Sequence, residues 1–122
     1  MIVIDTNIIL RYLLNDNEEL SKQAIDIIDN NTILIPNEVI VEACYVLRKV
    51  YNVEKEKIYE AVQSLMEIDN INFQNTNVVS LAFKTYATQN LDIVDCILYS
   101  YNRIEKYEVK TFDKKLNKLI SG

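Results

Sequence analysis

Histidine is absent from these 122 residues, and glycine and proline each occur once. Without histidine, Ser-His-Asp and Cys-His catalytic sites and histidine-ligated zinc sites are excluded. The single glycine is Gly122, so the chain has no glycine-rich loop of the kind that binds nucleotide phosphates or dinucleotides. These absences remove several large classes of enzyme.

Long apolar runs and disulfide patterns are also missing. No apolar run approaches the ~20 residues that span a membrane. The amino terminus, residues 1–5, lacks the basic start and cleavage site of a secretion signal. Cys44 and Cys96 lie in helix-like apolar stretches with no CxxC spacing, which predicts two buried, reduced thiols. We therefore expect a cytoplasmic protein without a membrane segment.

A basic surplus is the third feature that the chain lacks. Its net charge is -5, whereas simple DNA- or RNA-binding modules carry a positive footprint. The apolar share of 49% and charged share of 25% are typical of a folded globular protein. The length suits a single domain over residues 1–122.

Short apolar runs alternate with helical stripes along the chain. This alternation predicts an α/β domain with a central, mainly parallel sheet. The strands are expected at residues 2–5, 33–35, 71–73 and 108–111. The helices are expected at about 6–14, 17–30, 37–51, 54–69 and 92–106, with another after a cap at Asn75 or Thr76 and a short one after Asp113.

Four carboxylates stand out because of their surroundings. Asp5, Glu42 and Asp95 are each the only charge in an apolar stretch. Such isolated carboxylates are costly unless they are paired, protonated or metal-bound. Asp5 ends the first predicted strand and Asp113 follows the last one, so both should lie at the edge of the sheet where ligands bind in α/β folds.

Carboxylate oxygens without histidine or thiolate ligands favour Mg²⁺ or Mn²⁺. A cluster of them beside a phosphodiester suggests metal-assisted hydrolysis, in which the metal lowers the pKa of a bound water and neutralises charge. Either one metal ion or two could carry out this role. Asp92 shares a helical face with Asp95 and is an outer-shell candidate.

Each carboxylate also has a simpler explanation. Asp5, Asp92 and Asp113 could cap the helices that follow them. Glu42 could pair with an arginine such as Arg11 or Arg103. The combination of all four at the expected strand ends favours a site more strongly than any one of them does.

Four motifs in this order resemble those of PIN domains, and most closely the VapC-like toxins of toxin–antitoxin pairs. The resemblance covers essentially the whole chain. The motifs are Asp5-Thr6-Asn7, the stretch 36–43 around Glu42, the stretch 91–98 around Asp95, and Thr111-Phe112-Asp113.

The resemblance implies a three-layer α/β/α sandwich with a central, mainly parallel sheet of four to five strands. It also implies a Mg²⁺- or Mn²⁺-dependent endoribonuclease that acts on RNA, forms a homodimer and is bound by a cognate antitoxin. The metal ligands and catalytic residues would be Asp5, Glu42, Asp95 and Asp113, with Thr6, Asn7 and Thr111 as supporting hydrogen-bonding positions.

RNA contacts would depend on local basic residues. Without the five acids of the expected site, 13 acidic residues balance 13 basic ones, so the negative charge can be assigned to that site. Exposed members of the eight tyrosines could stack on bases. The candidates for phosphate contacts are Arg11, Lys110, Lys114 and Lys115, although the lysines could equally form a solvated terminus.

The residues around Asp5 bear on three other functions. A receiver-like signalling domain needs paired acids after the first strand, and a haloacid-dehalogenase-type phosphatase needs Asp-x-Asp there, whereas Thr6 and Asn7 follow Asp5. The remaining alternative is a catalytically silent PIN-fold scaffold in an RNA-associated or regulatory complex. Loss of a carboxylate would favour it, and none is missing.

Overall fold

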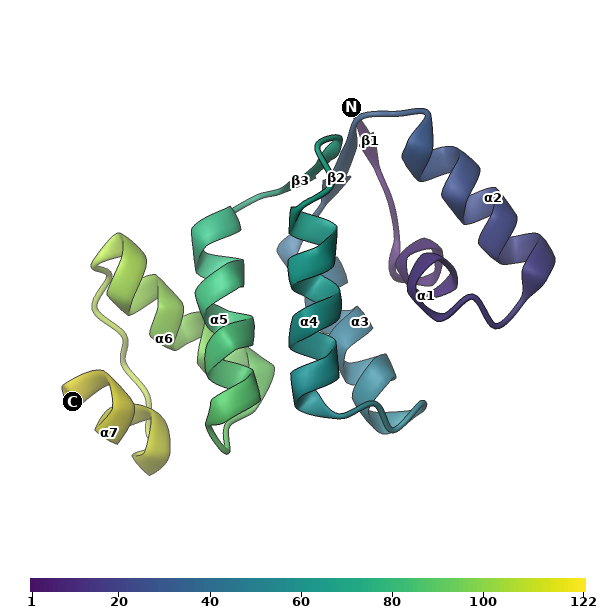
Figure 1. Cartoon of the computed structure of the whole chain (residues 1–122). Helices are drawn as coiled ribbons and strands as arrows, with labels where there is room; N and C mark the ends of the chain where they lie inside the picture. Colours follow the sequence, from purple (N-terminus) through teal and green to yellow (C-terminus); the bar gives the residue numbers. More distant parts are fainter.

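The computed structural model describes the whole chain, Met1–Gly122 (Figure 1). Three short parallel strands form one sheet in the order β1-β2-β3, and helices flank it, as expected for an α/β sandwich. The elements are β1 (Ile2–Val3), α1 (Thr6–Leu14), α2 (Glu18–Asp29), β2 (Ile33–Ile35), α3 (Asn37–Lys49), α4 (Lys55–Met66), β3 (Ile71–Phe73), α5 (Thr76–Thr88), α6 (Ile93–Glu105) and α7 (Lys114–Ser121).

The central strand β2 is the most deeply buried part of the sheet. Ile33 and Ile35 are both fully buried, as β-branched residues of a covered strand should be. Ile33 is in register with Ile2 of β1 and Ile71 of β3. Two helices connect each pair of neighbouring strands, so the strands run parallel and their carboxyl ends lie at one edge.

That edge is where α1, α3 and α5 begin, directly after β1, β2 and β3. A polar network joins two of these junctions to α6. The side-chain amide of Asn37 donates to Asn75 Oδ1 at 3.2 Å and to the Tyr101 hydroxyl oxygen at 3.1 Å. The backbone N–H of Asn37 donates to Gln74 Oε1 at 2.8 Å.

The sheet has three strands, so the prediction of four to five strands is wrong. Residues 108–111 pair with no strand. Lys106 ends α6 in a left-handed conformation, and Tyr107 then stacks on Tyr101 with ring centroids 6.0 Å apart. Because Asn102 also holds the Tyr107 carbonyl oxygen at 2.9 Å, the chain turns back along α6 instead of reaching β1 (Figure 1).

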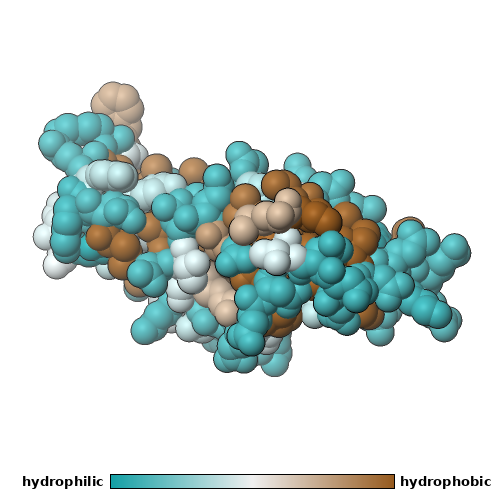
Figure 2. Space-filling view, turned by 90° about the horizontal axis from the view of Figure 1, so that it is seen from above, coloured by the Kyte–Doolittle hydropathy of each residue, from teal (hydrophilic) through white to brown (hydrophobic).

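The open edge of the sheet leaves apolar groups at the surface. Ile2 and Val3 of β1 are exposed, and Val3 retains 61% of its accessible surface. Seen from above, hydrophobic atoms form a larger patch right of the middle of the molecule and a smaller one toward its left end, with hydrophilic atoms around them (Figure 2). None of the helices has the length and apolar character needed to cross a membrane.

Candidate functional site

Asp5 lies at the turn between β1 and α1, two residues beyond the end of the strand. Its Oδ1 accepts a hydrogen bond from the backbone N–H of Ile8 at 3.1 Å, so the capping explanation is confirmed. The adjacent Thr6 is buried and donates from its hydroxyl to the carbonyl oxygen of Val39 in α3 at 3.5 Å. The start of α1 is thereby fixed against the first turn of α3.

Glu42 lies on the exposed side of α3 and forms no ion pair. The suggested pairing with Arg11 or Arg103 is wrong. Arg11 instead pairs with Asp16 at 2.5 Å, and Arg103 donates to the Tyr99 hydroxyl oxygen at 3.3 Å. The Glu42 carboxylate is therefore not neutralised by a neighbouring cation.

Asp92 caps α6 and also binds a tyrosine that sequence reasoning missed. Its Oδ1 accepts from the backbone N–H of Val94 at 3.3 Å and from the Tyr45 hydroxyl at 2.6 Å. Burial and the hydrogen bond to Asp92 raise the pKa of Tyr45 to about 12, so this hydroxyl stays a donor at neutral pH. Tyr45 follows Glu42 by three residues on the same helical face, and this spacing was the available signal.

Asp95 is half-buried in the first turn of α6. Burial raises the pKa of its carboxyl, and the negative charges of Asp113 and Asp92 raise it further. The structure thus brings these three carboxylates within electrostatic reach of one another. Mutual repulsion of this kind is relieved by a bound cation.

Asp113 caps α7, so its capping explanation is also confirmed. Its Oδ1 accepts from the backbone N–H of Leu116 at 2.8 Å. Its own N–H donates to the Thr111 hydroxyl oxygen at 3.0 Å, and the Thr111 carbonyl oxygen accepts from the Asn117 amide at 2.8 Å. Thr111 therefore fixes the backbone that presents the Asp113 side chain.

One face of α3 connects the two groups of carboxylates. Val39, Glu42 and Tyr45 follow at intervals of three residues, which places them on adjacent turns of one face. Val39 contacts Thr6, next to Asp5, and Tyr45 contacts Asp92. Glu42 lies between these contacts, but no three Asp, Glu, Cys or His side chains are gathered closely enough to hold a metal ion.

The four basic candidates fall into two pairs. Arg11 is engaged by Asp16 and by Asn7 Oδ1, which accepts from its Nε at 3.3 Å. Lys110 forms an exposed ion pair with Glu108 at 2.6 Å. Lys114 and Lys115 in the first turn of α7 form no ion pair.

Comparisons with known proteins agree with this arrangement of motifs. The family model described as PIN domain matches residues 2–120. The chain is also similar to a VapC ribonuclease of Aquifex aeolicus (strain VF5), with 26% identity over 124 residues, covering 98% of this chain and 92% of that protein. No solved structure matches the chain. Because the family match includes all four candidate carboxylates and nearly the whole length, this chain belongs to the PIN domain family.

Proposed function

We propose that this protein is an endoribonuclease that hydrolyses RNA phosphodiester bonds, and the toxin of a toxin–antitoxin pair. The observation that carries the proposal is the half-buried Asp95, whose carboxyl lies in the field of Asp113 and Asp92. The similarity to a VapC ribonuclease supports the choice of RNA as substrate.

A divalent cation fits the donor chemistry of these residues. Asp5, Glu42, Asp95 and Asp113 offer only carboxylate oxygens, the ligands that Mg²⁺ and Mn²⁺ prefer, with Asp92 as an outer-shell group. The caps at Asp5 and Asp113 use Oδ1, which leaves Oδ2 of each without a hydrogen bond. When bound, the ion would lower the pKa of a water molecule and neutralise charge that develops on the phosphate.

The remaining roles belong to side chains of the chain itself. Asp95 would orient the attacking water, since it is half-buried in the first turn of α6 with the carboxylates of Asp113 and Asp92 close enough to raise its pKa. Tyr45 would hold Asp92 in place through the 2.6 Å hydrogen bond. Thr6 and Thr111 would position the backbones that carry Asp5 and Asp113.

The test is Asp95→Asn, which keeps the size of the side chain and removes its charge. We expect loss of Mg²⁺- or Mn²⁺-dependent cleavage of a labelled single-stranded RNA by about 100-fold or more, within the usual range for a group that acts on the reacting water. Asp29→Asn is the control, because Asp29 is exposed at the end of α2 and forms no ion pair.

Two further measurements separate the mechanism from the fold. Circular dichroism should show an unchanged fold for Asp95→Asn, and electron paramagnetic resonance should show weakened Mn²⁺ binding. Cleavage that persists in this variant, or in excess chelator, would disprove the metal mechanism. RNA binding by the native chain without cleavage would favour the silent scaffold instead.

The proposed partners and location are tested in the cell. Expression in the bacterial cytoplasm should arrest growth, and co-expression of the protein encoded beside this one should restore it. Light scattering should give twice the monomer mass if the chain forms the proposed homodimer. Unimpaired growth together with confirmed RNA cleavage would favour a housekeeping nuclease over a toxin.

A further inference from the structure

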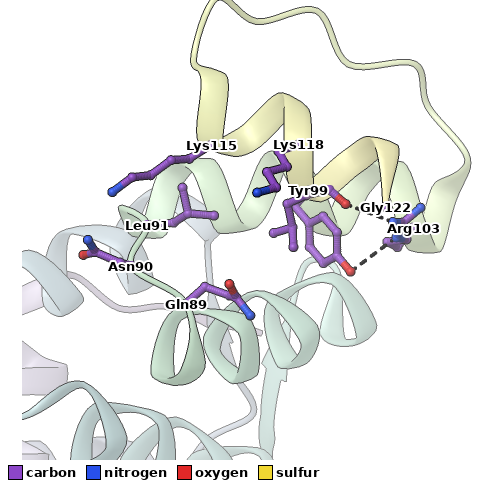
Figure 3. A pocket seen from close by; sticks show the side chains of 9 residues that line it. Gln89, Asn90, Leu91, Tyr99, Arg103, Lys115, Lys118 and Gly122 are labelled. Atoms are coloured by element: carbon purple, nitrogen blue, oxygen red, sulfur yellow. Dashed lines mark hydrogen bonds between the residues drawn. The ribbon is translucent and has the colours of Figure 1, made fainter.

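A cationic pocket lies between α6, α7 and residues 89–91, which follow α5, and it is outside the carboxylate cluster (Figure 3). It has a volume of about 520 Å³. Three basic side chains line it, Arg103 from α6 and Lys115 and Lys118 from α7, and no acidic side chain does, although the last residue, Gly122, also lies at the pocket. In a chain of net charge -5, a pocket with this composition is suited to an anion.

Arg103 is held in place by contacts that leave part of its guanidinium available. Its Nε donates to the Tyr99 hydroxyl oxygen at 3.3 Å, and the guanidinium carbon lies 5.1 Å from the Tyr99 ring centroid. Its Nη2 donates to the Leu119 carbonyl oxygen at 3.1 Å (Figure 3). Its Nη1 has no hydrogen-bond partner, so a planar donor group is pre-positioned for an incoming oxyanion.

The two lysines supply charge that nothing in the chain neutralises. Lys115 and Lys118 are three residues apart, so they share a face of α7. Both are exposed, and neither forms an ion pair. Their amino groups can therefore turn toward a bound anion without breaking an existing contact.

The pocket adjoins the proposed catalytic residues. Asp95, Tyr99 and Arg103 are spaced by four residues and lie along one face of α6. Arg103 is thus about 12 Å along the helix from Asp95. On the other side, the lining residue Leu91 directly precedes Asp92. An extended chain of phosphates could pass from one site to the other.

We infer that this pocket binds a backbone phosphate of the RNA, beside the bond that is cleaved. The inference rests on the proposed ribonuclease function, because that function supplies the RNA. Sequence reasoning identified Lys115 as a phosphate contact but missed Tyr99, Arg103 and Lys118 as members of one site.

The test replaces both lysines, as K115Q/K118Q, and measures binding of a short labelled single-stranded RNA in chelator, where metal-dependent cleavage is absent. The control K22Q/K84Q removes two other exposed helical lysines without ion pairs. We expect the pocket variant to bind about tenfold more weakly near 0.1 M salt. The slope of log K against log salt should decrease by about 0.7, the value of one lost phosphate contact on a single strand.

Four outcomes have distinct meanings. Restored binding in K115R/K118R, together with wild-type binding in K22Q/K84Q, would support the phosphate site. Equal affinity and slope in pocket variant and wild type would overturn it, while cleavage by the wild type would leave the proposed function intact. RNA binding that needs both lysines, without cleavage at any metal concentration, would keep the site and reject the nuclease. Binding of a glutamate-rich peptide but not RNA would assign the pocket to an acidic protein partner and overturn the inference.

Discussion

Single residues in the core have chemical properties that their burial changes. Cys44 is 2% exposed and Cys96 is fully buried. Burial raises the pKa of the Cys44 thiol to about 11 and that of Cys96 to about 12. Because the thiolate is the reactive form, both side chains should behave as small apolar groups in the folded protein.

Thiol reactivity and alkaline stability should both follow from these shifts. Native protein at pH 8 should react with a thiol reagent far more slowly than unfolded protein.

Each thiol loses its proton near pH 9 in the unfolded chain but only near pH 11 to 12 when folded, so the unfolded state releases protons first. The stability is therefore complete below pH 9 and decreases above it, by up to about 1.4 kcal/mol per pH unit for each thiol.

Denaturant titrations between pH 8 and pH 11 measure this dependence. The free energy of unfolding of Cys44→Ala should decrease more gently with pH than that of the parent chain, because one of the two thiols with a raised pKa is gone. If the stability of the parent chain did not change with pH over this interval, the raised pKa values of the two buried thiols would be contradicted.

Tyr45 is the residue through which α3 reaches Asp92. Tyr45→Phe removes the 2.6 Å hydrogen bond and keeps the ring. We expect cleavage and Mn²⁺ affinity to decrease by about tenfold to 100-fold, as for other groups that orient a metal-binding carboxylate. Tyr51→Phe is the control, because the Tyr51 hydroxyl makes only long contacts of 3.5 Å with Arg11 and Asp16. Equal Mn²⁺ affinity in all three proteins would show that Tyr45 does not position the site.

Helix ends are the elements that combine structural and proposed chemical roles. Asp5, Asp92 and Asp113 each accept a hydrogen bond from the first turn of a helix. A capping carboxylate at this position accepts a hydrogen bond from an otherwise unpaired N–H, and the positive end of the helix dipole stabilises its negative charge. Capping therefore does not argue against a metal-binding role for the same side chain.

The two roles of Asp113 can be separated by two substitutions. Asp113→Ala removes the cap, so the free energy of unfolding should decrease by about 1 kcal/mol. Asp113→Asn keeps an oxygen that accepts from Leu116, so the stability should change little, while RNA cleavage should still be lost. Thermal unfolding and the RNA assay measure the two effects. Full activity in Asp113→Asn would limit Asp113 to its structural role.

The whole molecule is stabilised by one apolar core in which sheet and helices meet. Phe83 in α5 is fully buried in this core, and its ring lies edge-on to Tyr86 with centroids 6.2 Å apart. Removing such a ring leaves a cavity, because the surrounding side chains relax only in part.

Phe83→Ala should therefore lower the free energy of unfolding by about 3–5 kcal/mol. This is a large share of the total of about 5–15 kcal/mol that is typical of a domain. Phe112→Ala is the matched control, because Phe112 is fully exposed and buries no area in the chain. Chemical denaturation of both variants gives the comparison. Equal losses of stability in Phe83→Ala and Phe112→Ala would mean that Phe112 is covered in solution, for example by a second copy of the chain.

The order and type of most elements were predictable because they depend on near neighbours. The helix expected at residues 6–14 is observed as Thr6–Leu14, and the strands at 33–35 and 71–73 match β2 and β3. The strand expected at 108–111 is wrong, since a strand forms only when a partner edge is within reach. The contacts of Tyr107 with Tyr101 and Asn102 direct the chain elsewhere, and no local pattern encodes them.

The sequence alone predicted the PIN-like motifs and the helix caps at Asp5, Asp92 and Asp113, because capping and periodicity act over three or four residues. Only the tertiary structure decided that Asp95 shares its surroundings with Asp92 and Asp113, that Tyr45 reaches Asp92, and that Arg11 is engaged by Asp16. It also brought Arg103 of α6 and Lys118 of α7 to the lining of one pocket. These pairings depend on how helices pack against one another, a property of the folded chain as a whole.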